Sequence, residues 1–231
     1  MKTNKTYKAS FKITNRYFEL SADSFIKHRR IIKQFRFFLT KKTSVSPKKT
    51  ETLKIRKRKK YITNFLLELM SILRKDNYIM FHGAALVKNG RAKVFLGPSL
   101  SGKTTLSFFS SRNGYKILSD DICLINKKTL KVAPFFRMPV RGHSSTQRFL
   151  KKHKIHIAKV NHKNKENELY LSDLRKCGIS FANKEYPIEK MYLFTTNKKS
   201  ILRKLPELCY LWNTRPAKEI LEDLKFLHNI I

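Results

Sequence analysis

The sequence predicts an α/β fold with a mixed, β-rich sheet at its core and a short, basic, β-rich region before it. Residues 79–96 form two apolar runs on either side of Asn89-Gly90, which is the strongest short hairpin signal in the chain. A glycine-containing loop follows the second run and leads into a helical stretch. Three further short runs have strand character: residues 115–118, 122–125 and 130–133. Since only turns separate these runs, we expect hairpins rather than strict βαβ alternation.

Residues 1–60 are predicted to form the basic N-terminal region. Within it, residues 7–20 alternate in part between apolar and polar side chains, which predicts a hairpin that turns around Asn15. The apolar and basic residues 31–39 fit either a strand or a short helix. Residues 44–52 are polar and contain a proline, and we expect them to form a loop.

Residues 61–231 are predicted to form the second domain. Apolar residues recur with a helical period over residues 61–74, so a helix should open this domain. Four later elements are also expected: a helix over 103–111 that ends at Asn113-Gly114, a helix over 147–154, a buried strand over 191–195 and an amphipathic closing helix over 217–228.

Positive charge dominates the chain. Fifty-one Lys and Arg stand against sixteen Asp and Glu, which gives a net charge of +35. This field attracts polyanions, but lysine enrichment over a whole chain also fits a compositional bias. We expect the basic residues to be spread over the surface, whereas a polyanion site would bring residues 54–60 and 151–165 to one face.

No segment reaches the ~18 apolar residues of a membrane-spanning helix, and the N-terminus lacks the apolar stretch of a secretory signal. Cys123, Cys177 and Cys209 are odd in number and widely spaced, which favours reduced thiols over a disulfide framework. Both observations predict a cytoplasmic protein, and no metal site is assigned to the cysteines.

Residues 97–104 match the nucleotide-binding pattern G-x-x-x-x-G-K-[ST], between a strand-like run and a helical run. The glycines let backbone N–H groups point at phosphate oxygens, Lys103 reaches the β- and γ-phosphates, and Thr104 offers its hydroxyl to Mg²⁺. ATP and Mg²⁺ are therefore the expected cofactors. The residues predicted to bind the nucleotide are Gly97, Pro98, Ser99, Leu100, Ser101, Gly102, Lys103, Thr104 and Thr105.

Two adjacent carboxylates, Asp120 and Asp121, follow the loop at the end of a predicted strand. A Mg–ATP site needs one carboxylate near the metal and gains from a second one that accepts a hydroxyl proton. We predict that Asp121, with Thr104, lies nearer the metal. A strand-end turn would use Asp as well, so the alternative is a purely structural pair.

Together these motifs resemble a known family. The order is His82-Gly83-Ala84, an apolar hairpin, the glycine loop, a helix, Gly114-Tyr115, a strand, Ser119-Asp120-Asp121 and then residues 132–135. This order is similar to the C-terminal catalytic domain of HPr kinase/phosphorylase, which shares its core with the ATP-dependent phosphoenolpyruvate carboxykinases. The resemblance covers residues 82–141.

The resemblance implies a kinase that phosphorylates a hydroxyl, with one aspartate as the base and His82 near the γ-phosphate. The catalytic residues would then be Asp120, Asp121, His82 and Lys103. Compact family members modify small molecules or precursor peptides. The chain departs from HPr kinase/phosphorylase proper because Arg141-Gly142-His143 stands where that enzyme has a Glu-containing, glycine-rich segment. A degenerate kinase is therefore one alternative.

The leading hypothesis is an ATP-dependent kinase whose acceptor is a hydroxyl of a peptide, a protein or a small molecule. The alternatives are a basic NTPase bound to nucleic acid, which would account for the charge, and a non-catalytic nucleotide-binding relative. Arg137 and Arg141 follow the resembling segment or close it, and a guanidinium suits bidentate phosphate contact, so one of them is expected to face the phosphates.

Overall fold

The computed structural model divides the chain into two compact units, Met1–Asp76 (unit 1) and Asn77–Ile231 (unit 2). It describes residues 6–35, 38–40, 50–55, 61–99, 101–136, 141–142, 148, 151–152, 169–170, 179–194, 208–209 and 215–230. The helix predicted over 61–74 is present, but it belongs to unit 1 rather than opening the second domain.

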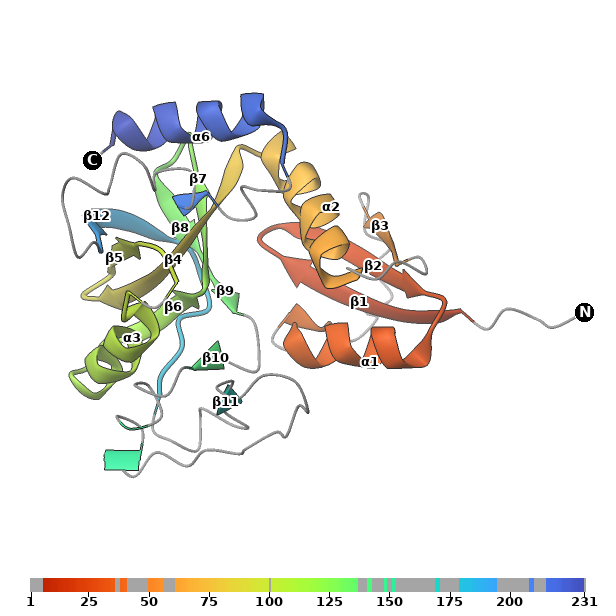
Figure 1. Ribbon diagram of the computed structural model, residues 1–231, viewed down its shortest axis with the longest axis horizontal. Helices are drawn as coiled ribbons and strands as arrows, with labels where there is room; N and C mark the ends of the chain where they lie inside the picture. Colours follow the sequence, from red (N-terminus) through yellow and green to blue (C-terminus); the bar gives the residue numbers. More distant parts are fainter. Residues whose placement is uncertain are drawn as a thin grey trace, which may run out of the picture. The chain divides into compact units, whose positions relative to one another are not determined.

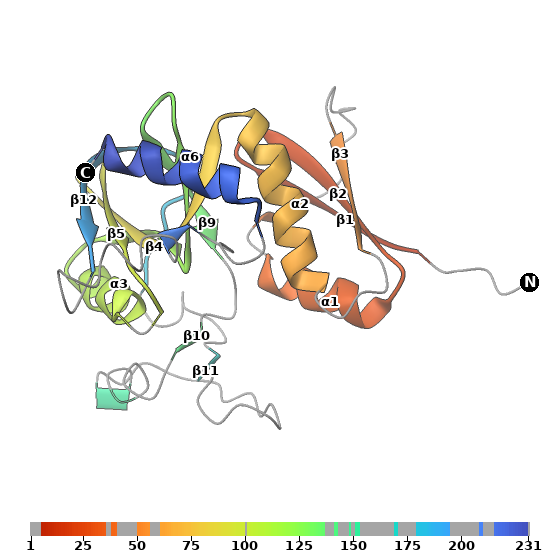
Figure 2. The same ribbon diagram turned by 45° about the horizontal axis from the view of Figure 1, so that its top comes forward.

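Unit 1 contains a three-stranded sheet and two helices. Its elements are β1 (Tyr7–Ile13), β2 (Arg16–Ala22), α1 (Phe25–Gln34), β3 (Thr50–Ile55) and α2 (Tyr61–Lys75). β1 and β2 form the predicted antiparallel hairpin, and β3 pairs in parallel with β2 after the α1 crossover. In Figure 2, α2 runs alongside the strands of this sheet.

An aromatic cluster ties both helices to one face of this sheet. The ring of Phe65 in α2 lies 6.5 Å from that of Phe11 in β1 and 5.0 Å from that of Phe35, which follows α1. All three rings are buried. Arg16 at the start of β2 links two other parts of the unit, because its guanidinium donates to Asp76 after α2 and to Glu51 of β3.

Two features of unit 1 differ from the predictions. α1 makes the first part of the apolar segment over 31–39 helical, which is one of the two alternatives, but the helix begins several residues earlier, at Phe25. Part of the loop predicted over 44–52 is the strand β3. β3 has few apolar residues, and among those whose burial is described only Leu53 is fully buried.

Unit 2 is built on a large mixed sheet, and the predicted mixed, β-rich α/β architecture is therefore confirmed. Its strands are β4 (Tyr78–Lys88), β5 (Arg91–Leu96), β6 (Lys116–Asp120), β7 (Ile122–Asn126), β8 (Lys131–Ala133), β9 (Phe135–Phe136) and β12 (Tyr186–Leu193). Among the described residues they follow the order β5-β12-β8-β7-β4-β6-β9. β5 also pairs with β4, so five of the strands form a closed ring. A separate short pair joins β10 (Arg141–Gly142) to β11 (Leu169–Tyr170).

The long strand β4 organises this sheet. Its first half pairs with β7 and its second half with β5 and β6, always antiparallel. Ala85 lies opposite Ser119 and His82 lies opposite Ile122, so the register does not slip where β6 becomes β7. β6 and β7 are thus nearly one strand, interrupted at Asp121.

Two helices cover unit 2 on opposite faces, as Figure 1 shows: α3 (Lys103–Arg112) and α6 (Ala217–His228). α3 packs against β4 and β6. α6 buries Ile220 and Leu227 against the core formed by Val94, Leu118 and Ile125. The valine, isoleucine and leucine side chains of the sheet supply the apolar surface that holds the helices against it.

Most elements predicted for the second domain are present. The hairpin at Asn89-Gly90, the helix at α3, the strands at β6, β7 and β8 and the closing helix α6 are confirmed. β12 is the strand expected over 191–195, but it begins earlier and its side chains are half-buried rather than buried. The helix expected over 147–154 lies largely outside the described residues. Cys123 and Cys209 are buried thiols.

Gly83 in the middle of β4 should tolerate no side chain. A Cβ there would lie 2.7 Å from Leu96 Cδ2, 2.9 Å from the carbonyl oxygen of Phe95 and 3.0 Å from Cys123 Sγ. We expect Gly83→Ala to lower the free energy of unfolding by about 1–3 kcal/mol through overpacking. Urea denaturation measures the change, and Lys116→Ala on the exposed side of β6 is the control. Equal stability of the two variants would contradict this account.

Candidate functional site

The loop that contains residues 97–102 connects β5 to α3 and is held tightly at its first residue. A Cβ at Gly97 would lie 2.8 Å from both Cβ and the carbonyl oxygen of Phe194, so only glycine fits. Gly102 has a φ of 92°, in the left-handed region, and directly precedes α3. We call residues 97–104 the candidate phosphate loop; Leu100 lies outside the described residues.

Lys103 folds back over this loop. Its ammonium donates to the carbonyl oxygens of Gly97 at 2.8 Å and Pro98 at 2.7 Å, and to Ser101 Oγ at 3.2 Å. The side chain is buried, and burial lowers the pKa of the ammonium while the charge of Asp120 opposes that decrease. The loop therefore encloses a positive charge at the N-terminus of a helix, which is the electrostatic setting that favours an anion.

Asp120 is the buried carboxylate beside the loop. Its Oδ2 accepts a hydrogen bond of 3.2 Å from Thr104 Oγ1, whereas its buried Oδ1 has no hydrogen-bond partner among the residues that the structure describes. Burial raises the pKa of Asp120 to about 7, and the charge of Asp121 adds to the increase. An unsatisfied buried carboxylate oxygen is costly, so this position is suited to a cation or a further donor.

Asp121 occupies a different environment, although it is the next residue. Its φ of 76° is in the left-handed region, which turns its side chain away from the alternation of a regular strand. Its Oδ1 lies 3.5 Å from His82 Nε2, and 41% of its side chain is exposed. The two aspartates thus offer one buried and one accessible carboxylate.

The middle of β4 holds these segments together through backbone hydrogen bonds. The N–H of Gly97 donates to the carbonyl of His82, and the N–H of Gly83 donates to the carbonyl of Asp121, each at 3.3 Å. The start of the loop and the aspartate pair therefore flank the same two residues of one strand. A site built on paired strands keeps its geometry better than one built on free loops.

The structure brings Lys103, Thr104 and Asp120 together and places Asp121 with His82. Thr104 donates to Asp120, whereas the sequence predicted Thr104 with Asp121 on the metal side; which aspartate lies nearer a metal stays a prediction. Ser99 is exposed and Thr105 is half-buried. Arg137 lies outside the described residues, and Arg141 begins β10 but its side chain is not described.

Sequence reasoning missed two residues that shape this site. Phe194 packs against Gly97 because β12 runs parallel to β5, and its N–H donates to Leu96 O at 2.6 Å. Gly83 enters the sequence analysis only as part of a motif, although a Cβ there would lie within 3.0 Å of atoms of Phe95, Leu96 and Cys123. The sequence indicates these contacts only through the glycines at positions 83 and 97. No local pattern predicts that β12 pairs in parallel with the distant strand β5.

The residues present fit a bound Mg–nucleotide. The unpartnered Asp120 Oδ1, the adjacent hydroxyl of Thr104 and the ammonium of Lys103 provide a metal side and a phosphate side. No group of three or more His, Cys, Asp or Glu that could hold a metal by itself occurs in the described parts of the chain. A cation here would need oxygen ligands from the nucleotide, which is how Mg²⁺ is usually bound.

Comparison with known proteins gives no further assignment: no protein-family model and no curated protein matches this chain. In the described portion, no helix is long and apolar enough to cross a membrane.

The stability of the protein without ligand should fall as pH rises through the titration of Asp120. Its folded-state pKa of about 7 exceeds the ordinary value of 3.8, so the folded protein holds the proton more tightly than the unfolded chain does. The free energy of unfolding then decreases between about pH 4 and about pH 7, by at most about 4 kcal/mol.

Asp120→Asn should remove this part of the pH dependence. Urea denaturation between about pH 5 and about pH 8 without nucleotide measures it, and Glu222→Gln on the exposed side of α6 is the matched control. If Asp120→Asn and the unsubstituted protein lose the same stability over this range, the carboxyl does not titrate there.

Proposed function

We propose that this protein is an ATP-dependent phosphotransferase that moves the γ-phosphate of Mg–ATP to a hydroxyl group. The observation that carries the proposal is the contact between Thr104, in the candidate phosphate loop, and the buried Asp120. A hydroxyl directly after the loop lysine, joined to a strand-end carboxylate, is what a Mg–nucleotide site requires. The resemblance of residues 82–141 to the HPr kinase/phosphorylase catalytic domain supports the same reaction.

In this proposal, Thr104 and Asp120 hold the metal side of the nucleotide. Bound Mg²⁺ would supply positive charge that offsets the negative charge of the phosphate oxygens during transfer. Lys103 exchanges at least one of its loop acceptors for a β- or γ-phosphate oxygen, and the loop N–H groups and the N-terminus of α3 add to the positive field. These groups act by position and charge rather than by covalent chemistry.

Asp121 is the base for the acceptor. The acceptor oxygen forms a bond to the γ-phosphorus while the bond to the β-phosphate oxygen breaks, and the acceptor proton passes to a carboxylate. Asp121 is accessible for this role, and His82 lies near enough to orient it. Asp120 is less suited, because it is buried and occupied by Thr104. The roles expected from the sequence are thereby exchanged between the two aspartates.

The direct test is transfer of label from γ-labelled ATP, in the presence of Mg²⁺, to a library of hydroxyl-bearing peptides and metabolites. We expect a labelled phosphate ester. Release of labelled inorganic phosphate alone, unaffected by any acceptor, would indicate an NTPase instead.

Lys103→Ala should abolish nucleotide turnover. The substitution removes the charge that contacts the phosphates, and we expect the rate to fall at least about 100-fold. Lys116→Ala removes an exposed lysine from β6 and should leave the rate unchanged. Turnover and ATP affinity are measured for both variants. Tight ATP binding with unchanged turnover in Lys103→Ala would refute the assignment of the phosphate loop.

The two aspartates should separate in their kinetic effects. Asp120→Asn should raise the Mg²⁺ concentration needed for half-maximal activity by about 10-fold or more. Asp121→Asn should lower kcat by about 100-fold or more and leave ATP affinity nearly unchanged. Mg²⁺ titrations and initial rates distinguish the two, with Glu222→Gln as the control. Full activity in both variants would make the pair a structural turn.

A further inference from the structure

The strands β5 and β12 turn an ordered set of side chains away from the core. They run in parallel, and their inward residues, among them Val94 and Leu193, join the core of unit 2. Because side chains alternate across a strand, the residues between these face the other way. On that outer face lie Lys93 and Phe95 from β5, Lys190 and Tyr192 from β12, and Phe194, which directly follows β12.

A bulge in β12 adds charge to this face. Ile188 pairs with Ala92 but Lys190 pairs with Lys93, so Glu189 is an extra residue between them. Glu189 lies 3.7 Å from Lys93 Nζ. The carboxylate of Glu189 therefore forms an ion pair with Lys93, and the neighbouring Lys190 is exposed.

Three rings on this face are arranged against one another. The rings of Phe95 and Tyr192 are stacked, with centroids 4.9 Å apart and planes at 7°. Phe194 meets Phe95 edge-on at 5.8 Å. All three are half-buried. We call Phe95, Tyr192 and Phe194 the aromatic platform. Because these three rings already pack on one another, they lose little side-chain entropy when a ligand binds.

Lysines border the aromatic platform. Lys190 Nζ lies 5.4 Å from the centroid of the Tyr192 ring. Lys93, which pairs with Lys190 across the two strands, lies 5.9 Å from the centroid of the Tyr115 ring, and Lys88 lies 5.0 Å from the same centroid. The two paired lysines therefore lie at the end of the platform away from Phe194, and each is next to an aromatic ring.

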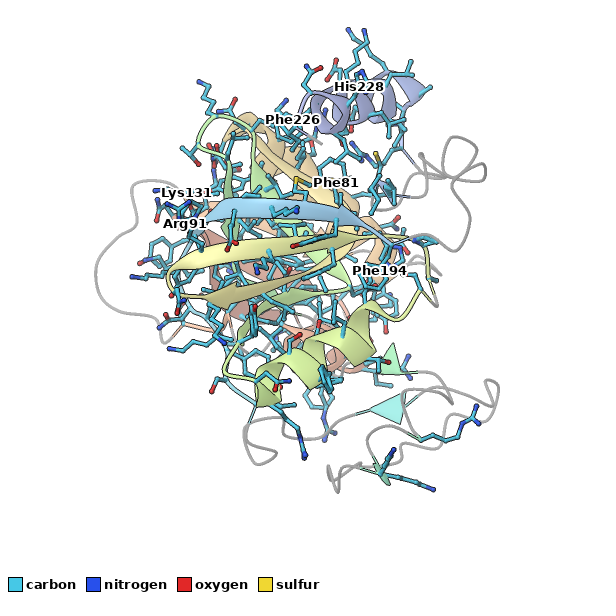
Figure 3. All side chains as sticks on the ribbon, turned by 90° about the vertical axis from the view of Figure 1, so that its left-hand side faces the viewer. Phe81, Arg91, Lys131, Phe194, Phe226 and His228 are labelled. Atoms are coloured by element: carbon cyan, nitrogen blue, oxygen red, sulfur yellow. The ribbon has the colours of Figure 1, made fainter. Side chains whose placement is uncertain are left out.

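The position of the aromatic platform is also informative. α3 packs on the outer face over β4 and β6, while α6 packs on the inner face. Figure 3 looks onto β12 and β5, with α3 below them and with Phe194 at the end of β12 far from Arg91 and Lys131. At that end Phe194 touches Gly97, so the platform adjoins the candidate phosphate loop.

We propose that the aromatic platform and its flanking lysines bind single-stranded nucleic acid. Unpaired bases stack on exposed aromatic faces, and lysines beside the rings neutralise the phosphates between the bases. A duplex keeps its bases stacked inside, and an acidic peptide would use the lysines but not the rings. The overall charge of +35 does not point to this surface, whereas the lysines placed beside the rings do. The proposal does not depend on phosphoryl transfer.

The test measures binding of the full-length protein, without ATP, to two labelled oligonucleotides of about 12 residues, within the usual site size. One is oligothymidylate and the other is an abasic strand with the same number of phosphates. Stacking should make oligothymidylate bind at least about 5-fold more tightly. Tyr192→Leu keeps apolar bulk but removes the ring and should abolish this preference. Equal affinity for the two strands in the unsubstituted protein would overturn the proposal.

A second pair of variants tests where the oligonucleotide binds without changing the rings of the aromatic platform. Lys190→Glu changes an exposed lysine beside Tyr192, and Lys218→Glu makes the same change on α6. Lys190→Glu should weaken binding of both strands and reduce its salt dependence, whereas Lys218→Glu should have a much smaller effect. Equal effects would indicate diffuse attraction and contradict the site. Displacement of oligothymidylate by polyglutamate at equal charge would contradict it in favour of an acidic polypeptide.

Discussion

The close approach of three strands at Gly83 is the constraint on which unit 2 depends. With no side chain there, Leu96, Phe95 and Cys123 can all come within van der Waals contact of one backbone position. Gly83 and its neighbour His82 also provide the backbone groups that bind the phosphate loop and the aspartate turn. The distance between these two segments is therefore fixed by the sheet.

Without a ligand, the candidate site costs the folded protein free energy. Lys103 is buried with its charge directed at carbonyl oxygens of its own loop, and Asp120 is buried with one oxygen unpartnered. Desolvation disfavours both charged forms, which is why the pKa values of the two groups move toward each other. A cation and a phosphate would together satisfy what the fold leaves unsatisfied. Such local cost is typical of functional sites.

Much of the architecture could be predicted because the signals were local. Asn89-Gly90 marks a hairpin by turn chemistry, and the apolar period of α2 requires no partner to be recognised. The strand β3 was missed because its burial depends on a parallel partner far away in the chain. The same holds for the contact of Phe194 with Gly97. The different environments of Asp120 and Asp121 depend on a left-handed φ at Asp121, which a pair of adjacent carboxylates in the sequence does not reveal.

The closed ring of strands restricts what can be recognised on the outer face of unit 2. β5 is paired with β4 along one edge and with β12 along the other, so its backbone N–H and C=O groups are already used within the sheet. A polymer bound there would meet ring faces and ammonium groups and no row of backbone donors. Ring faces accept any base, and ammonium groups accept any phosphate. Such a surface would discriminate between flexible and paired strands while remaining neutral to the order of bases along them.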